Sequence, residues 1–397
     1  MNVALALSLA ALLPALALAL ANAPKLPGVT SAIQTALDAQ EISGAVTVVV
    51  TKDTVLHRAA LGFADLAEQK PMQSDTIFWI KSMTKPVTGV AILLLQDEGK
   101  LNVDDPVANY LPEFSGLKTP SGQPANLTIA HLLTHTSGLG EGLGETGSAT
   151  DPARTLADLV RQALASPMQF EPGARWKYTQ SGINTAGRIV EIVSGLTFDR
   201  FLQQRLFDPL GMKDTTFYPT AAQVPRIVTR YTKNKETGKL EPVAPRPDIL
   251  ARNRPPLATS GIYSTGPDFA RLCQMLLNAG EFNGRRFLQP ETVKLFSTPR
   301  TGGLKAGFAP GTAWGLSCSI VGEPQGVTAM LSPGTYGHGG AFGTQAWIDP
   351  VKGVAYVLMI QREKFGTPGY RNGDDTAVRK DFQQAAWAAL ANPVSDR

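Results

Sequence analysis

Two side chains that could carry out acyl transfer, Ser82 and Lys85, lie three residues apart near the start of the apolar segment 77–101, IFWIKSMTKPVTGVAILLLQDEGKL. Residues i and i+3 share one face of a helix, so the Lys85 amine is expected to reach the Ser82 hydroxyl. At a helix N-terminus, Ser82 would also lie beside free backbone N–H groups that could bind an oxyanion. Pro86 favours this placement because proline is tolerated near a helix start. The alternative is a serine N-cap followed by a surface lysine.

A second pair with the same spacing, Ser115 and Lys118, serves as an internal control. It lies in LPEFSGLKTPSGQPAN, a loop rich in proline and glycine with no apolar helix behind it. Spacing alone is therefore a weak signal. The helical context is what favours Ser82 as the nucleophile.

Tyr178, in the segment EPGARWKYTQSGIN, is a candidate general base. It occupies a turn just before a helical segment, from which a phenol could project into a cleft. A phenol held near a cationic Lys85 would have a lowered pKa and could accept a proton. The alternative is a tyrosine that only packs.

The tripeptide His338-Gly339-Gly340 predicts a glycine-rich turn that enters a strand. Glycines permit close approach of the backbone to a ligand. The N–H group of the next residue, Ala341, could therefore complete an oxyanion hole. The alternative is a hairpin turn with an exposed histidine.

The remaining histidines and the cysteines predict no metal site. His131 and His135 lie four residues apart without the glutamate of an H-E-x-x-H motif, which favours structural roles, and no Cys/His cluster has zinc spacing. Cys273 lies in a helical apolar pattern that indicates a buried thiol. Whether it pairs with Cys318 cannot be decided from the sequence.

Composition narrows the class of protein. The chain has 397 residues with a net charge of +4, and its 37 basic and 33 acidic residues are interspersed rather than clustered. This distribution gives no indication of nucleic-acid binding.

Residues 1–23 predict a secretory signal peptide. The segment is almost entirely alanine and leucine, and small residues at Ala17, Ala19 and Ala21 offer cleavage sites. Cleavage after Ala19 or Ala21 is favoured, because a cut after Ala23 would leave a proline next to it. A periplasmic or secreted location is therefore expected. The alternative is an uncleaved membrane anchor, since about 20 apolar residues can span a bilayer.

Strands are predicted near both ends of the chain and helices between them. A hairpin is expected from 45–50 and 55–62, a helix from Ser82 to Gly99, and late strands at 312–321, 342–350 and 353–361. This order predicts an α+β fold, an antiparallel sheet flanked by helices with an all-helical insertion. The expected division is an α/β domain from 24–101 and 251–397, and a mainly helical domain from 102–250, with a catalytic cleft between them.

Taken in order, the segments SMTK, YTQ and HGG make the chain resemble the serine β-lactamase and penicillin-binding-protein family. The likeness is to its class C branch, nearest to the family VIII carboxylesterases. It extends from about Ile33 to the last strands and includes LNVDDPVANYLPEF, LTIAHLLTHTSGL and YGHGGAFGTQAWIDP. Several ordered blocks make this resemblance specific, and it implies the β-lactamase/transpeptidase-like fold.

The resemblance implies a role for each candidate residue. Ser82 would be the nucleophile, Lys85 would activate it, and Tyr178 would pass the proton to the leaving group. The N–H groups of Ser82 and Ala341 would form the oxyanion hole, and His338 would line the pocket beside Gly339 and Gly340. The reaction implied is two-step acyl transfer through an acyl-serine, with water as the second acceptor and no metal or organic cofactor.

Two departures from the family pattern bear on the substrate. Gln180 stands where the family usually has asparagine, so its amide is one methylene longer. His338-Gly339-Gly340 replaces K-T-G and removes a fixed cation that helps to bind the carboxylate of β-lactams, a role that a neutral imidazole fills poorly. We therefore expect a carboxylesterase for short-chain or small aromatic esters, with weak β-lactam hydrolysis as a side activity.

Other functions stay open at this point. The alternatives are a class C-like β-lactamase or a D-amino-acid peptidase such as a DD-carboxypeptidase. An alternative of another kind is a non-catalytic penicillin-binding or cell-wall-associated protein. The expected partner is a small-molecule ester, β-lactam or D-peptide, with a membrane involved only if residues 1–23 are not removed.

Overall fold

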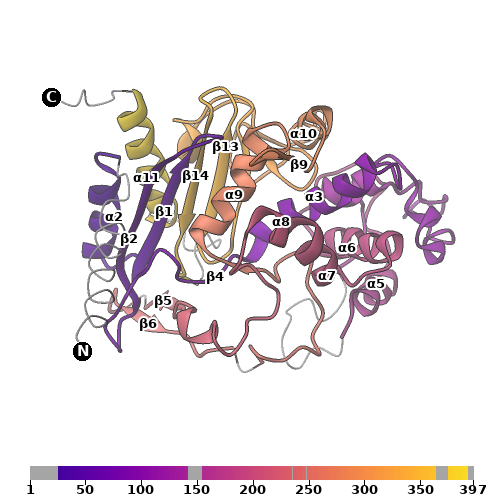
Figure 1. Ribbon diagram of the computed structural model, residues 1–397. Coiled ribbons are helices and arrows are strands. Elements are labelled where there is room, and N and C mark those ends of the chain that lie inside the picture. The colour runs from indigo at the N-terminus through magenta and orange to yellow at the C-terminus, as the bar shows by residue number, and fades with distance from the viewer. Residues whose placement is uncertain (1–25, 142–153, 235, 247, 364–373, 392–397) are drawn as a thin grey trace, which may run out of the picture.

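The centre of the protein is an eight-stranded antiparallel sheet in the order β10-β11-β12-β13-β14-β1-β2-β3 (Figure 1). The computed structural model describes residues 26–141, 154–234, 236–246, 248–363 and 374–391. The predicted α+β fold, with one antiparallel sheet built from both ends of the chain, is confirmed. The strands are β1 Gly44–Val50, β2 Val55–Asp65, β3 Lys70–Pro71, β10 Thr312–Trp314, β11 Ser319–Val321, β12 Tyr336–Gly339, β13 Gln345–Asp349 and β14 Val354–Met359.

Strand β1 joins the two ends of the chain. It pairs with β2 through the predicted hairpin and with β14 on its other side, where Val46 faces Met359 and Val48 faces Val357. Every residue of β1 is buried. Its run of β-branched residues therefore suits a strand that is covered on both faces of the sheet.

Helices cover both faces of the sheet because alternate side chains of a strand point in opposite directions. From β1, Val46 and Val48 pack into the core that contains α9 (Gly266–Leu277). Ala45 and Val49 pack on the other face, in the core that contains α2 (Val29–Asp38) and α11 (Asp374–Ala391). Figure 1 shows α2 and α11 on one side of the sheet and α9 on the other.

Helix α3, Thr84–Asp97, connects the sheet to the helices of the middle of the chain. It is buried from Thr84 to Leu95 and contacts α6 and α10. The other helices of this part are α4 Ile129–Leu133, α5 Leu156–Leu164, α6 Ser181–Ser194, α7 Phe198–Leu202, a π-helical turn Gln203–Phe207, α8 Asp208–Leu210 and α10 Pro290–Phe296. The division at residues 102 and 250 stays a prediction.

Short elements complete the fold. Two-stranded ladders join β4 Phe78–Trp79 to β7 Tyr263–Ser264, β5 Tyr231–Lys233 to β6 Leu240–Pro242, and β8 Glu281–Phe282 to β9 Arg285–Arg286. Single 3₁₀ turns span Lys81–Met83, Val107–Asn109, Pro112–Phe114, Val224–Arg226 and Gly326–Thr328.

The prediction of one strand over 312–321 is wrong. The segment forms two strands, β10 and β11, which pair with each other around a tight turn at Gly315 to Cys318. Ser317 adopts a left-handed backbone with φ 69°. Its N–H donates to the Leu133 carbonyl at 2.9 Å, so the turn is held against the end of α4 by a contact that local sequence does not encode.

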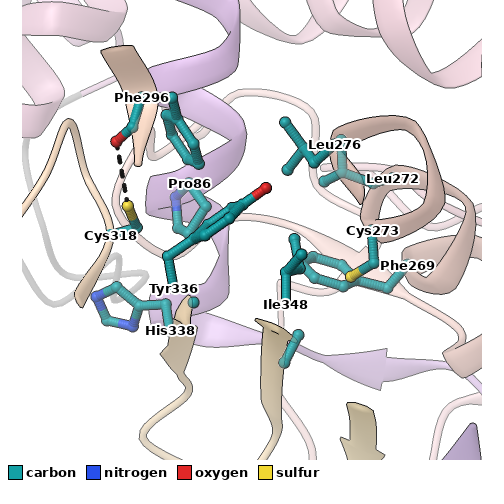
Figure 2. Close-up of a pocket in the computed structure, with 12 residues that line it drawn as sticks. Pro86, Phe269, Leu272, Cys273, Leu276, Phe296, Cys318, Tyr336, His338 and Ile348 are labelled. Carbon is teal, nitrogen blue, oxygen red and sulfur yellow. Dashed lines mark hydrogen bonds between the residues drawn. The ribbon is translucent and has the colours of Figure 1, made fainter. Parts of the chain in front are cut away.

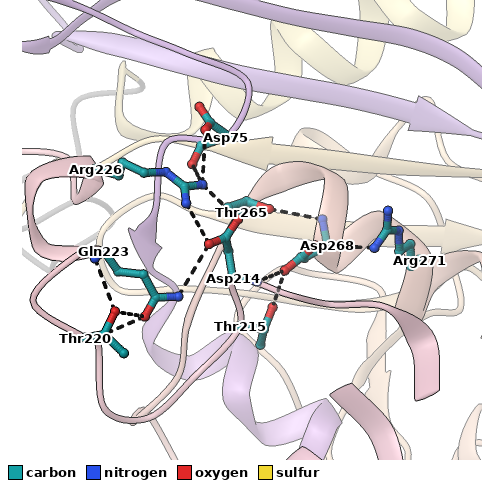
Figure 3. A network of polar contacts seen from close by, with 9 residues as sticks. All are labelled: Asp75, Asp214, Thr215, Thr220, Gln223, Arg226, Thr265, Asp268 and Arg271. Carbon is teal, nitrogen blue, oxygen red and sulfur yellow. Dashed lines mark hydrogen bonds and ion pairs between the residues drawn. The ribbon is translucent and has the colours of Figure 1, made fainter. Parts of the chain in front are cut away.

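A polar network fixes the segment that follows α8, from Asp214 to Arg226 (Figure 3). The Arg226 guanidinium donates to both carboxylate oxygens of Asp214, at 2.7 and 2.8 Å. Asp268, near the start of α9, accepts from the Asp214 backbone N–H at 2.8 Å. This network anchors the chain around Arg226, whose carbonyl accepts from the Ile77 N–H at 2.9 Å just before β4.

Both cysteines are free and buried, on either side of the Tyr336 ring in a small apolar cavity (Figure 2). Burial raises the pKa of both thiols. The buried thiol predicted for Cys273 is confirmed, and Cys273 and Cys318 form no disulfide. The predicted signal peptide, 1–23, lies outside the described residues. Within those residues, no helix is both long and apolar enough to cross a membrane.

Candidate active site

Ser82 lies in a single 3₁₀ turn, Lys81–Met83, that leads directly into α3. The α-helix itself begins at Thr84, so Ser82 precedes the α-helix instead of starting it. The first residue of the turn, Lys81, is left-handed, with φ 50°. Such a conformation costs a non-glycine residue about 1–2 kcal/mol and is often found at functional sites.

Lys85 is fully buried and lies directly below Ser82. Its Nζ is 3.4 Å from Ser82 Oγ, 2.8 Å from Gln180 Oε1 and 3.1 Å from the Thr259 carbonyl. A buried amine is normally paired, because an unpaired charge is costly to desolvate. Here the amine is held among oxygen atoms, and one of them is the candidate nucleophile.

Tyr178 lies immediately before α6, as predicted, and faces the same lysine. The Lys85 Nζ is 4.7 Å from the centre of the Tyr178 ring. The segment that carries Tyr178 is fastened to His135. The Lys177 N–H donates to the His135 carbonyl at 2.9 Å, and the Thr179 N–H donates to His135 Nδ1 at 3.3 Å.

The expectation of a lowered pKa for Tyr178 is wrong. Burial raises the pKa of the phenol above its ordinary value, and a hydrogen bond with the Ser82 side chain only partly offsets this. Glu141 raises it further because its negative charge disfavours a phenolate. In the free protein Tyr178 is therefore a neutral phenol, which suits it to donate a proton.

Replacing Tyr178 by phenylalanine is expected to lower kcat for ester hydrolysis by about 10²–10⁴-fold, the usual contribution of a proton-transfer group. The ring and its packing are kept, so the thermal midpoint should change little. Steady-state kinetics with aryl and alkyl esters measure the effect. Alkyl esters should lose more, because an alkoxide needs protonation more than a nitrophenolate does. Equal losses on both would contradict proton donation by the phenol.

Gln180 is held inside the site by two neighbours. Its side-chain oxygen accepts from Lys85, and its backbone N–H donates to Glu141 Oε1 at 2.8 Å. The second carboxylate oxygen of Glu141 is buried and has no hydrogen-bond partner among the described residues. The side chain of Gln180 therefore reaches the Lys85 amine directly.

The His338-Gly339-Gly340 tripeptide does not form a turn entering a strand. His338 and Gly339 end strand β12, and the turn follows them. Gly340 is required by close packing, since a Cβ there would meet the Ile80 carbonyl at 2.5 Å. Thr344 closes the turn by donating to the same Ile80 carbonyl at 3.2 Å. The turn thus lies against the segment that carries Ser82.

The two expected oxyanion donors are available. Among the described residues, the backbone N–H groups of Ser82 and Ala341 donate to no protein acceptor. Ala341 is exposed and follows Gly340, which packs on Ile80. The two segments are adjacent, as an oxyanion hole built from both would require.

His338 is buried, not exposed, and it stays neutral at physiological pH. Burial lowers its pKa to about 3, and the positive charge of Lys85 adds to this effect. Its ring packs edge-on against Trp314, with centroids 5.5 Å apart. Trp314 and Tyr178 belong to one aromatic wall, whose other rings are His135, Trp176 and Phe308.

The buried histidines are expected to make the fold acid-sensitive. His338 has a depressed pKa in the folded state, so below about pH 6.5 the unfolded chain binds a proton that the folded chain does not. The stability that the neutral His338 contributes is therefore fully present above pH 6.5, and it is lost as the pH falls toward 3. Each such group contributes up to about 1.4 kcal/mol per pH unit.

Urea unfolding of the wild type and His338→Gln at pH 7, 6 and 5 measures this slope. We expect a shallower slope in the variant, and His135 to account for part of what remains, because its pKa is also lowered by burial. Identical slopes in the two proteins would contradict a neutral, buried His338.

Sequence reasoning missed the contribution of His135. Its role is structural, as expected, but it serves the site: its ring centroid is 4.5 Å from that of Tyr178, and it supports the segment 177–179. Its backbone has a φ of 59°, which places it in the left-handed region and turns the chain toward the site. No local pattern relates it to Thr179, 44 positions closer to the C-terminus, or to the neighbouring Tyr178. Among the described residues, no group of three or more His, Cys, Asp or Glu side chains could hold a metal ion.

Comparison with known proteins places the site in a family context. A family model described as Beta-lactamase matches residues 29–379. Protein Rv1367c of Mycobacterium tuberculosis is 34% identical, with 85% of this chain and 90% of that protein covered. Esterase EstB of Burkholderia gladioli is 30% identical, with 84% and 90% covered. The structure of EstCE1, a hydrolase with promiscuous acyltransferase activity, superposes with a TM-score of 0.79 at 24% identity, covering 90% of this chain and 97% of that one.

Proposed function

The chain belongs to the beta-lactamase family as a serine hydrolase, and from that premise we propose that it is a carboxylesterase for short-chain or small aromatic esters. The proposal rests on the arrangement of Ser82, Lys85 and Tyr178 and on the neutral His338 beside them. It is supported by the likeness to an esterase along most of both chains.

In the first step, Ser82 Oγ attacks the ester carbonyl carbon and its proton passes to the unprotonated form of the Lys85 amine, whose Nζ is 3.4 Å away. The N–H groups of Ser82 and Ala341 stabilise the oxyanion. The C–O bond to the leaving group breaks, and the alcohol departs with the proton donated by the Tyr178 phenol. Tyr178 regains a proton from Lys85, whose Nζ lies 4.7 Å from the centre of its ring.

In the second step, water attacks the acyl-serine carbonyl and gives up a proton to the same pair of residues. The bond to Ser82 breaks, the acid leaves, and the serine hydroxyl is restored. The two steps together consume one ester and one water and release one acid and one alcohol.

The observation that favours an ester over a β-lactam is the charge at His338. Its pKa of about 3 makes it neutral at pH 7, so it provides no cation for the carboxylate of a β-lactam. Weak β-lactam hydrolysis is consistent with this site, because acyl transfer to Ser82 does not itself need that cation.

The substrate class is tested by comparing p-nitrophenyl acetate, p-nitrophenyl butyrate, nitrocefin and D-alanyl p-nitroanilide, with Ser82→Ala as the control. We expect kcat/KM to be highest for the two esters. Nitrocefin turned over fastest would favour a β-lactamase, and D-alanyl p-nitroanilide would favour a D-amino-acid peptidase. No turnover of any substrate above the control would favour a non-catalytic penicillin-binding protein.

We also propose export to the periplasm or beyond, on the composition of residues 1–23. N-terminal sequencing of the protein from its own cells is expected to begin after Ala19 or Ala21. A chain that retains residue 1 would overturn this and favour an uncleaved anchor.

A further inference from the structure

A cavity of about 200 Å³ borders the segment that leads into Ser82, and Tyr178 is not part of its lining. Trp79, three residues before Ser82, forms one wall. A cavity of about 150 Å³ can hold benzene, so this one has room for a short acyl chain. Its other walls are largely apolar, and the lining includes Val224, Ile227, Val243, Pro245, Ile249 and Tyr263.

The apolar cavity is surrounded by more positive than negative charge. Arg230 and Arg246 line it, and each is paired with one carboxylate, Glu363 at 2.5 Å and Asp248 at 2.5 Å respectively. The third cation is Lys81, the residue before Ser82. Within the described chain, no carboxylate lies within ion-pair distance of its ammonium group.

The ammonium of Lys81 lies over two aromatic rings, that of Trp79 in the cavity lining and that of the neighbouring Phe342. Its Nζ is 4.0 Å from the Trp79 ring centre and 5.1 Å from that of Phe342. Phe342 directly follows Ala341, a candidate oxyanion donor. The cation therefore lies at a ring that lines the cavity, and it neighbours both segments that carry the candidate oxyanion donors.

Two separate groups of aromatic rings, one around Tyr178 and one around Trp79, suggest different places for the leaving group and the acyl chain of the ester. Tyr178 belongs to the aromatic wall with His135, Trp176, Phe308 and Trp314, and it is the residue proposed to donate to the leaving oxygen. Trp79 contacts Tyr263 and Phe342, and in the described chain neither of these rings contacts the wall around Tyr178. The leaving group belongs with Tyr178, which leaves the Trp79 side for the acyl chain.

We propose that this cavity is the acyl subsite for esters whose acyl chain carries a carboxylate, such as monoesters of short dicarboxylic acids, with Lys81 as the partner of that carboxylate. The inference rests on the proposed esterase function and names its substrate class. The polar network around Arg226 keeps the cavity wall in place, because Ile227 and Val228 follow it directly (Figure 3).

The decisive experiment compares mono-p-nitrophenyl adipate with p-nitrophenyl hexanoate, which differ only by the terminal carboxylate. In the wild type at low salt we expect kcat/KM for the adipate ester to be about tenfold higher, the effect of an ion pair of about 1.4 kcal/mol. In Lys81→Met this ratio should fall to about one, and Lys81→Arg should restore most of it. Lys118→Met, at an exposed lysine of the control loop, should keep the wild-type ratio.

The outcomes separate this inference from the proposed function. A wild-type ratio of one or less, or a ratio unaffected by Lys81→Met, would overturn the acyl subsite while leaving the esterase in place. Failure of both esters to exceed Ser82→Ala would overturn the esterase function itself. Turnover of hexanoate by Lys81→Met above that control shows that the variant is folded.

A second pair of esters tests which side of the substrate enters the cavity. 4-Acetoxybenzoate and 4-acetoxybenzamide carry or lack a charge on the leaving group. We expect their ratio to be the same in the wild type and in Lys81→Met. A ratio that falls in the variant would place the leaving group in the cavity and overturn the assignment.

The adipate preference should also fade at alkaline pH. Burial and the nearby positive charges of Arg246 and Arg230 lower the pKa of Lys81 to about 8, and the negative charge of Glu363 opposes them. Among the described residues of the cavity wall, the other paired carboxylate is Asp248. Lys81 is therefore cationic below pH 8 and neutral above it, whereas the adipate carboxylate stays charged. A ratio that is constant from pH 6.5 to 9.5 would contradict the role of the ammonium.

Discussion

Ser82→Ala is expected to lower kcat for ester hydrolysis by about 10⁴-fold or more, the loss seen when a serine hydrolase is deprived of its nucleophile. The attacking oxygen is removed, and the N–H groups and the cavity can then only bind the ester. Because Ser82 is small and partly exposed in its turn, the thermal midpoint should stay within a few degrees of the wild type.

Ser115→Ala is the matched control for this variant. Ser115 follows a 3₁₀ turn, it is exposed, and the neighbouring Lys118 is exposed as well. The structure gives it no buried amine, so its replacement should leave kcat and KM at the wild-type values. A large loss in Ser115→Ala, or full activity in Ser82→Ala, would mean that the wrong pair was chosen.

Lys85→Met should have the second largest effect, a fall in kcat of about 10³-fold or more. The Lys85 amine, 3.4 Å from Ser82 Oγ, is the proposed acceptor of the Ser82 proton, and it holds the Gln180 side chain in place. Methionine fills a similar volume and brings no charge that must be desolvated. The variant should therefore fold, with activity rather than stability lost.

Lys85→Arg separates proton transfer from positive charge. A guanidinium keeps the charge but does not give up its proton near pH 7. We expect this variant to be as inactive as Lys85→Met in steady-state assays, with thermal unfolding as the check on folding. Activity within tenfold of the wild type in either variant would contradict a role for Lys85 as the proton acceptor.

The parts of the fold that the sequence predicted are those with strong local patterns. The run AVTVVV gave β1 because β-branched residues buried on both faces form a central strand. The β10–β11 turn was not predictable, since Ser317 takes a left-handed backbone only because its N–H finds the Leu133 carbonyl. The 3₁₀ turn at Ser82 was missed for the same reason, as it depends on the strained Lys81.

The candidate site was predictable where one segment carries the chemistry. The pair Ser82 and Lys85 needs only one helical turn to meet. The environment of these groups was not predictable, because it is assembled from distant segments. Burial and Glu141 raise the pKa of Tyr178, against the expectation from Lys85 alone. His135 and the cavity beside Lys81 likewise exist only after tertiary packing.

The most direct test of the account is the identity of the acylated residue. The protein is mixed with p-nitrophenyl butyrate, quenched in acid, digested with trypsin and analysed by tandem mass spectrometry. Trypsin cleaves after Lys81 but not between Lys85 and Pro86, so Ser82 lies in peptide 82–100 and Ser115 in peptide 101–118. We predict a butyryl group on Ser82, absent from Ser82→Ala. A butyryl group on Ser115, or turnover with no acylated peptide, would contradict it.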